Sequence, residues 1–340
     1  GATRGSAVAT SAHPTDGVVR WGILGPGRIS TRIVRATGSS ERSELVAVAS
    51  RDAGRAGAYA SAHGIGRSFG SYEALLASPD VDAVYIALPN HLHAEWTVRA
   101  LEAGKHVLCE KPMALSVAEV DAVIAAADRS GRIATEAFMA LHHPQTLRAV
   151  ELAQSGALGP LQLVSGTFSF LLDHPGDPRI DPDMGGGSLW DVGCYPVNVA
   201  RRVAGEEPDR VSAFARFDER GVDRTFIGQL HFPSGLLAQF DSGFAAADRE
   251  RVEIVGNDGR LVLDAPFLPE PDGPPAGLTR WQGGSSTRIE IPWVDQYRLE
   301  VDDLVGAILD GSPPRLPLSF TRGSIATLVD LDRVARANAS

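Results

Sequence analysis

The sequence contains little cysteine, and the two residues present are not arranged for chemistry. Cys109 and Cys194 are the only cysteines in 340 residues, and neither belongs to a C-x-x-C pair. This argues against a zinc site or a thiol redox motif. Two isolated thiols are typical of a protein of the reducing cytosol, so we expect a cytoplasmic protein with both cysteines free and buried.

Long basic runs and long apolar runs are also missing. The net charge is −10, and the sequence has no long cluster of Lys and Arg that could bind the phosphates of a nucleic acid. This argues against a nucleic-acid partner. No apolar run reaches the roughly 18 residues of a membrane span, so no membrane partner is expected. The histidines at 93, 142 and 143 are not spaced with carboxylates as metal ligands, and no metal is assigned. Residues 1–17 lack the apolar core of a secretory signal and are predicted to be a disordered tail.

What the sequence does contain is enough apolar residues, 44%, for two globular domains in 340 residues. From residue 18 to about 137, short apolar runs alternate with amphipathic helices. This alternation predicts an α/β domain with a doubly wound parallel sheet, a Rossmann domain, at 18–140. Its strands are expected at 18–24, 45–50, 83–88, 106–109 and 133–135.

After residue 160 the pattern changes to longer strands joined by short turns, such as 233–235 and 256–259. Short turns make neighbouring strands antiparallel, so 141–340 is predicted to be an α+β domain with a mostly antiparallel sheet. A Pro- and Gly-rich stretch at 266–286 is expected to be an irregular loop, and two helices end the chain. The strands are expected at 161–170, 210–217, 224–232, 236–244, 251–255 and 260–263.

A glycine loop follows the first expected strand. Gly25 and Gly27 flank a proline, and a helix is expected to begin near Arg28 and Ile29. A phosphate at a helix N-terminus needs free N–H groups and close backbone approach, which glycines permit. Ser30 holds the third fingerprint position, where Gly or Ala is usual. The strand–turn–helix context favours a dinucleotide site over a plain turn.

The second strand ends at Ser50 and Arg51. An enzyme that uses NAD(H) usually has an acidic residue here for the ribose 2′-hydroxyl, whereas a hydroxyl and a guanidinium suit a 2′-phosphate. We therefore expect NADP(H) to be favoured over NAD(H). Two points argue against this preference: Asp52 is adjacent, and Arg51 is alternatively only a surface residue.

Two more motifs follow buried strands. Pro89, Asn90 and His93 come after the third long strand, and Glu110 with Lys111 after the next. Open α/β sheets bind ligands at the carboxyl ends of their strands, so we expect these residues to line the dinucleotide, with Lys111 near the nicotinamide. Lys111 alone would be explained as an exposed loop lysine.

Three glycines at 185–187 lead to Asp191 and Tyr195, which share one face of a helix because they are four residues apart. A phenol that exchanges the hydroxyl proton, an ammonium that lowers the phenol's pKa, and a carboxylate that orients both are the groups for proton-coupled hydride transfer. Alone, the pair would be explained as a helix-end acid and a packing tyrosine. Together with Lys111, both are predicted to be catalytic.

In this order the motifs resemble the Gfo/Idh/MocA family of sugar-type oxidoreductases. The resemblance rests on the loop at 25–27, on 89–93 and 110–112, on 136–145, and on the GGG-x₃-D-x-G-x-Y run at 185–195. It covers residues 18 to about 335. It implies a Rossmann domain followed by an α+β domain with a large open sheet. That sheet often meets another subunit, so a homodimer or homotetramer is expected.

The resemblance also implies Lys111 as the catalytic lysine, with Asp191 and Tyr195 beside it. Many members have histidine where this chain has Tyr195. The tyrosine is similar to a subgroup with NADP-dependent D-xylose dehydrogenases, dimeric dihydrodiol dehydrogenases and nucleotide-sugar 3-ketoreductases. Because Tyr195 replaces that histidine, Lys111 is an alternative proton donor. Phe138 and Arg179 are expected in the substrate pocket, and a loop salt bridge is the alternative for Arg179.

The predicted function is NADP(H)-dependent hydride transfer to or from a sugar-like carbonyl or hydroxyl. The substrate is either a nucleotide-linked ketosugar reduced at C3, slightly favoured by the run 141–145, or a free aldose such as D-xylose oxidised at C1. A catalytically silent dinucleotide sensor is an alternative of another class, and the intact Lys111, Asp191 and Tyr195 argue against it. Glycosidic cleavage through transient oxidation with bound NAD is disfavoured by the serine and arginine at 50–51.

Overall fold

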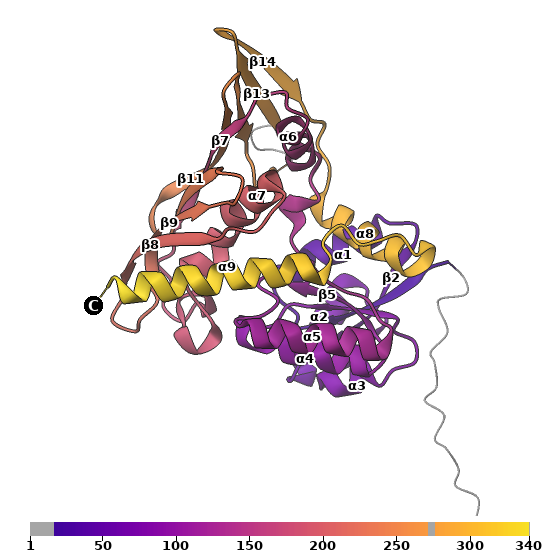
Figure 1. Ribbon diagram of the computed structural model, residues 1–340. Coiled ribbons are helices and arrows are strands. Elements are labelled where there is room, and N and C mark those ends of the chain that lie inside the picture. The colour runs from indigo at the N-terminus through magenta and orange to yellow at the C-terminus, as the bar shows by residue number, and fades with distance from the viewer. Residues whose placement is uncertain (1–16, 271–275, 340) are drawn as a thin grey trace, which may run out of the picture.

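The computed structural model describes residues 17–270 and 276–339, so the predicted tail at 1–17 lies, apart from Gly17, outside the described residues. Two sheets organise these residues (Figure 1). The first is wholly parallel, in the order β3-β2-β1-β4-β5-β6. Its strands are β1 Val19–Leu24, β2 Ser43–Ala49, β3 Arg67–Phe69, β4 Ala83–Ile86, β5 His106–Glu110 and β6 Ala134–Ala137.

This strand order reverses between β1 and β4, which is where a doubly wound sheet opens a crevice for a ligand. The predicted Rossmann architecture is confirmed, with one additional strand, β3. Three residues without an apolar run carry no strand pattern, so sequence periodicity could not identify β3. The helices of this part are α1 Ser30–Gly38, α2 Ala53–His63, α3 Tyr72–Leu76, α4 Asn90–Glu102 and α5 Val117–Ser130.

Local signals fix the helix ends. Ser116 and Glu119 form a reciprocal capping box at the start of α5, and Gly131 ends that helix in a left-handed conformation. Ser71 accepts a hydrogen bond at the start of α3 in the same manner. Asp52 does so at the start of α2.

The second sheet has eight strands in the order β14-β13-β12-β11-β7-β10-β9-β8. All its neighbours are antiparallel except β7 and β10, which run parallel. The predicted mostly antiparallel sheet is thus confirmed. Its strands are β7 Leu161–Leu171, β8 Arg210–Phe217, β9 Asp223–His231, β10 Leu237–Gly243, β11 Ala245–Gly256, β12 Arg260–Asp264, β13 Gly277–Gln282 and β14 Ser285–Glu290.

The expectation of an irregular loop over 266–286 is wrong for its second half. Residues 277–290 form the β13–β14 hairpin, and its two-residue turn is Gly283-Gly284, both with positive φ. A glycine pair between two short runs is a turn that suits the twist of a hairpin. That signal was present in the sequence but was outweighed by the prolines before it.

The second sheet is covered on one face only. Inward side chains such as Phe226, Phe240 and Ile254 are buried, together with the helices α6 Pro144–Gln154 and α7 Cys194–Ala204. The other face leaves large apolar side chains exposed. These are Phe214 (62% exposed), Ile227 (54%), Leu237 (49%), Leu171 (68%) and Trp281 (40%).

The last two helices return to the first sheet (Figure 1). α8, Gln296–Asp310, packs on α1, and α9, Leu318–Ala337, crosses from α5 to β8. A domain boundary at 140 therefore assigns to the second domain a helix that packs on the first. No helix among the described residues is long and apolar enough to span a bilayer. Cys109 and Cys194 are both free and buried, as expected.

Candidate functional site

The glycine loop lies at the switch point, between β1 and α1. Gly25 has a φ of +94°, and a Cβ there would lie 2.6 Å from the Ala87 carbonyl oxygen, so no other residue fits. A Cβ on Gly27 would meet nothing within 4 Å, so this glycine faces open space. Ser30 donates from Oγ to the Gly25 carbonyl (2.8 Å) and closes the turn from within. The unusual serine therefore stabilises the loop.

The start of α1 is open to a ligand. No side chain caps the helix at Ile29, which is partly exposed, and Arg28 is exposed beside it. Uncapped N–H groups at the positive end of a helix dipole attract an anion. Together with the exposed face of Gly27, they form a cradle of the kind that binds a pyrophosphate.

The end of β2 presents a hydroxyl and a guanidinium. Ser50 is 6% exposed and its Oγ accepts from the Asp52 N–H (3.2 Å), which leaves its own proton to donate. Arg51 is exposed and forms no ion pair with any described residue. The Asp52 carboxylate accepts from the Arg55 N–H (3.0 Å) and caps α2, so it is committed to the helix. Arg55, which sequence reasoning missed, reaches back to the Pro26 carbonyl of the glycine loop (2.5 Å).

The residues after β4 are used mainly for internal contacts. Asn90 donates from its amide to the Gly185 carbonyl (3.0 Å) and so joins the first domain to the glycine run of the second. Gly185 has a φ of +75°, a left-handed conformation that favours glycine at this point. Both ring nitrogens of His93 face main-chain oxygens, those of Pro112 (2.8 Å) and Leu88 (2.6 Å). His93 is thus held within the protein, and its contact with the dinucleotide stays a prediction.

Lys111 meets Asp191 across the two domains. Its ammonium donates to Asp191 Oδ1 (2.9 Å) and to the Asp191 main-chain oxygen (2.6 Å). The two side chains are only 12% and 18% exposed, so the exposed-loop interpretation of Lys111 does not hold. Burial acts to lower the pKa of Lys111, but attraction to Asp191 outweighs it and the pKa is raised. The lysine thus stays charged at neutral pH.

Asp191 lies on a π-helical turn, Leu189–Gly193, and not at a regular helix start. The Cys194 N–H bonds to the Leu189 carbonyl, five residues back, and α7 follows directly. The Asp191 carbonyl on this turn accepts hydrogen bonds from the Lys111 ammonium (2.6 Å) and from the Cys194 thiol (3.4 Å). Such turns occur often at functional sites.

Tyr195 presents its ring, not its hydroxyl, to Lys111. The ammonium lies 5.1 Å from the ring centroid, within cation–π range. The hydroxyl points to Met139 Sδ, 3.6 Å away, and the residue is 4% exposed. The sequence argument expected the ammonium to lower the phenol's pKa; instead, burial raises the pKa of Tyr195 well above its usual range.

An aromatic cluster surrounds that tyrosine. Phe138 lies edge-on at 4.8 Å between ring centroids, and Phe168 and Phe267 each lie at 5.3 Å. Phe138 is 1% exposed. It packs on Tyr195, and its contact with a substrate stays a prediction.

Arg179 combines the two alternatives considered for it. It forms a bidentate salt bridge with Asp177 (2.9 and 2.8 Å) in its own loop. Its Nη1 also lies 4.0 Å from Asp191 Oδ2, on the side of that carboxylate away from Lys111. Asp191 thus stands between two cations, Lys111 and Arg179.

Glu110 belongs to a buried acidic cluster behind Lys111. It accepts hydrogen bonds from the Tyr85 hydroxyl and from the Lys111 N–H. Burial raises the pKa of Glu110, and it raises the pKa of Glu300 further, whose two carboxylate oxygens have no hydrogen-bond partner among the described residues. Glu110 is partly exposed, and its contact with the dinucleotide stays a prediction.

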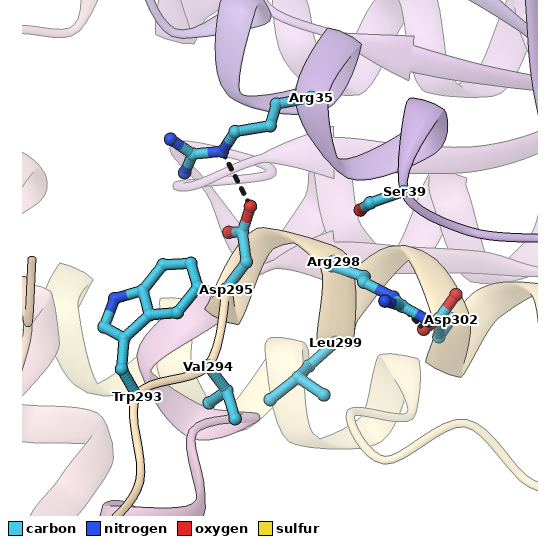
Figure 2. Close-up of a pocket in the computed structure, with 8 residues that line it drawn as sticks. All are labelled: Arg35, Ser39, Trp293, Val294, Asp295, Arg298, Leu299 and Asp302. Carbon is cyan, nitrogen blue, oxygen red and sulfur yellow. Dashed lines mark hydrogen bonds and ion pairs between the residues drawn. The ribbon is translucent and has the colours of Figure 1, made fainter. Parts of the chain in front are cut away.

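A surface pocket of about 450 Å³ lies elsewhere, between the C-terminal end of α1 and the start of α8 (Figure 2). Its two arginines are already paired: Arg35 with Asp295 (2.8 Å) and Arg298 with Asp302 (3.1 Å). This pocket is separate from the glycine loop and from Lys111. No group of three or more metal-ligating side chains occurs within 17–270 and 276–339.

Known proteins share this arrangement. Residues 19–138 match a family model described as "Oxidoreductase family, NAD-binding Rossmann fold" (GFO_IDH_MocA), and residues 146–262 match the GFO/IDH/MocA C-terminal domain. The chain is 42% identical over 299 residues to D-xylose 1-dehydrogenase (NADP(+)) 2 of Haloferax volcanii, covering 87% of this chain and 91% of that one.

Two further relatives cover almost the whole chain. The dTDP-3,4-didehydro-2,6-dideoxy-alpha-D-glucose 3-reductase of Actinomadura kijaniata is 34% identical over 320 residues, 93% of this chain and 95% of its own. Among solved structures, an aldose-aldose oxidoreductase from Caulobacter crescentus complexed with glycerol superposes with a TM-score of 0.87 at 32% identity. It covers 94% of this chain and 98% of that one.

Proposed function

Since the chain belongs to the Gfo/Idh/MocA oxidoreductases, we propose that it is an NADP(H)-dependent enzyme that transfers hydride to or from a sugar carbon. The observation that carries the proposal is the buried Lys111–Asp191 pair at the carboxyl end of β5, beside an open glycine cradle. A silent dinucleotide sensor has no need for such a pair.

The residues present fit a dinucleotide. Gly25 allows the turn, Gly27 leaves its outer side clear, and the uncapped start of α1 faces the same space. A bound nicotinamide would supply or accept the hydride. The protein's part is to place the sugar oxygen against Lys111 while the sugar carbon faces the coenzyme.

We assign the proton to Lys111 and not to Tyr195. The ammonium is fixed by two hydrogen bonds to Asp191, and its third hydrogen is free to bond to a sugar oxygen. In reduction it would donate a proton to the alkoxide that forms. Oxidation is the reverse: the ammonium first releases a proton to solvent, and the neutral amine then accepts the proton of the sugar hydroxyl. The Tyr195 hydroxyl is directed at Met139, so the ring supports the ammonium from below.

Replacing Lys111 tests the assignment. Lys111→Ala is expected to lose at least about 100-fold in kcat, since it removes both the charge and the proton carrier. Binding of NADPH, followed by quenching of its fluorescence, should stay within a few-fold of wild type. Near-normal turnover by this variant would overturn the proposal.

NADP(H) is proposed as the preferred coenzyme. Arg51 is exposed and has no ion pair among the described residues, so no carboxylate competes with a 2′-phosphate for it. The Asp52 carboxylate caps α2 and would therefore not repel that phosphate directly. The D-xylose relative is named for NADP(+), which agrees. The cytoplasmic location expected from the cysteines stays a prediction.

Two substrate classes are candidates. A free aldose oxidised at C1 comes first, because relatives named for aldose chemistry include one that is 42% identical and one that superposes with a TM-score of 0.87. A nucleotide-linked ketosugar reduced at C3, slightly favoured by the sequence, comes second through the 3-reductase relatives. A panel of aldoses with NADP⁺ and nucleotide-linked ketosugars with NADPH separates them, and no turnover in either arm would refute both.

A homodimer or homotetramer through the open sheet is also proposed. Phe214 and Ile227 are direct cross-strand partners on its outer face and both are more than half exposed. Apolar side chains gathered on one face of a soluble protein commonly mark an interface. A second copy of the same sheet would bury them.

A further inference from the structure

The turn that carries Lys111 is held by side chains from other elements. The Met113 N–H donates to Glu136 Oε1 on β6 (2.8 Å), and the Pro112 carbonyl faces His93 Nδ1 on α4 (2.8 Å). The polar main-chain groups that follow Lys111 are therefore fixed from two sides.

His93 joins the loop after β4 to the loop after β5. It is 1% exposed, and its second ring nitrogen lies 2.6 Å from the Leu88 carbonyl in the loop after β4. A neutral imidazole has a single N–H, so it donates to only one of the two carbonyls. Burial lowers the pKa of His93, which keeps the ring neutral.

Glu136 is a costly residue to bury for packing alone. It is 2% exposed, and its carboxyl group interacts with the Met113 N–H and with the Thr321 side chain. Burial of a carboxyl group destabilises the fold unless hydrogen bonds offset it, and an apolar residue could not make the bond to Met113.

We propose that His93 and Glu136 are positioning residues that fix the turn at 111–113 so that the Lys111 ammonium meets Asp191. The proposal rests on the proposed function, in which Lys111 carries the proton. Lysine is a long, flexible side chain, so its ammonium is placed no better than the main chain beneath it. A displacement of about 1 Å in a reacting group lowers turnover by about 100-fold.

Partial mimics of His93 give the sharpest test. Asparagine places its amide nitrogen where Nδ1 stands and keeps the bond to Pro112, whereas glutamine reaches the Nε2 position and keeps only the bond to Leu88. We expect His93→Asn to keep kcat within a few-fold, and His93→Gln and His93→Leu to lose about 10- to 100-fold. The dissociation constant of NADPH should change by less than about threefold.

His106 provides the matched control. It lies at the opposite end of β5, is 2% exposed, and contacts the Ile133 N–H and Arg132 through its two ring nitrogens. His106→Leu should lower the thermal midpoint as His93→Leu does but leave kcat unchanged. Equal kcat losses in the two variants, or a normal kcat in His93→Leu, would overturn the proposal.

Glu136 is tested by rescue. Glutamine still offers Oε1 to Met113, so Glu136→Gln should recover most of the kcat that Glu136→Ala loses, with NADP⁺ and D-xylose or whichever substrate of the panel the wild type turns over. If Glu136→Gln is as slow as the alanine variant, the hydrogen bond to Met113 is not what matters and the proposal fails.

Amide hydrogen exchange separates this proposal from the function. Exchange of the peptide spanning 111–116 should speed up at least about tenfold in His93→Leu and Glu136→Ala and stay unchanged in His106→Leu. If no substrate turns over, the proposed function fails, yet faster exchange still supports the fixed turn. Unchanged exchange refutes the positioning role whatever the activity.

Discussion

Single residues differ in how far their charges are already satisfied. The Lys111 ammonium is bound twice by Asp191, and Arg179 is bound twice by Asp177. Arg51, by contrast, is exposed and forms no ion pair with any described residue. Of these three cations, Arg51 at the end of β2 is therefore the one that can bind an added anion without breaking an ion pair.

Replacing Arg51 should therefore change coenzyme preference. Arg51→Ala removes a charged hydrogen-bond donor worth roughly 1.5–3 kcal/mol, so KM for NADP⁺ should rise about 10- to 100-fold while KM for NAD⁺ changes little. Steady-state kinetics with both coenzymes measure this. Arg99→Ala, which removes an exposed arginine paired with Glu95, serves as control. A parallel rise for both coenzymes would contradict a 2′-phosphate contact.

Tyr195 gives a second prediction at this scale. Tyr195→Phe keeps the ring under the ammonium and removes a hydroxyl that contacts Met139, so kcat should fall by less than about tenfold. Tyr195→Ala should cost about 3–5 kcal/mol of unfolding free energy through the emptied cluster. If Tyr195→Phe is as inactive as Lys111→Ala, the Tyr195 hydroxyl and not Lys111 is the proton donor.

Among the elements, those with strong periodic or capping signals were predictable from sequence. β4 is an unbroken apolar run, β1 is apolar apart from Arg20 and Gly22, and α5 has its capping box and terminal Gly131. β3 is three residues long with no pattern of its own. It forms because β2 offers a free edge, which is a tertiary cause that sequence reading cannot see.

The sequence allowed the residues of the candidate site to be predicted, but not the directions in which their polar groups point. Spacing placed Asp191 and Tyr195 on one helix face, but it could not show that Asp191 would lie on a π turn with its carbonyl bonded to Lys111. The direction of the Tyr195 hydroxyl toward Met139 and the contacts of His93 with two carbonyls depend on neighbours far away in sequence. Such contacts leave no local pattern.

Glu136 on β6 should make the free energy of unfolding depend on pH, and the Glu136→Gln variant should lack this dependence. Burial raises the pKa of Glu136 from 4.5 to about 7. A carboxyl whose pKa is raised on folding holds its proton more tightly in the folded state, so it costs stability as pH rises from 4.5 to about 7. Glu136→Gln has no such proton and should gain up to about 3 kcal/mol relative to wild type across that window.

Denaturant unfolding of both proteins between about pH 5 and about pH 8 measures the difference. The gap between them should widen with rising pH. Two parallel curves would mean that Glu136 keeps an ordinary pKa in the folded protein.

For the whole molecule, the open sheet decides the assembly. If its outer face meets a second copy, Phe214→Glu should convert the oligomer to a monomer with little loss of fold, because the side chain is 62% exposed in the isolated chain. Light scattering after gel filtration gives the mass. Trp293→Glu changes a 49% exposed aromatic beside α8 and should leave the mass unchanged. A wild-type protein that is already monomeric would refute the interface.

The bond between Lys111 and Asp191 is one of several contacts that join the two parts of the chain, together with the Asn90–Gly185 bond and the packing of α8 on α1. The ammonium comes from the end of a strand of one sheet, and its acid comes from a turn between two strands of the other. Neither part alone therefore holds the charged pair, and a change in the angle between the two parts would separate it.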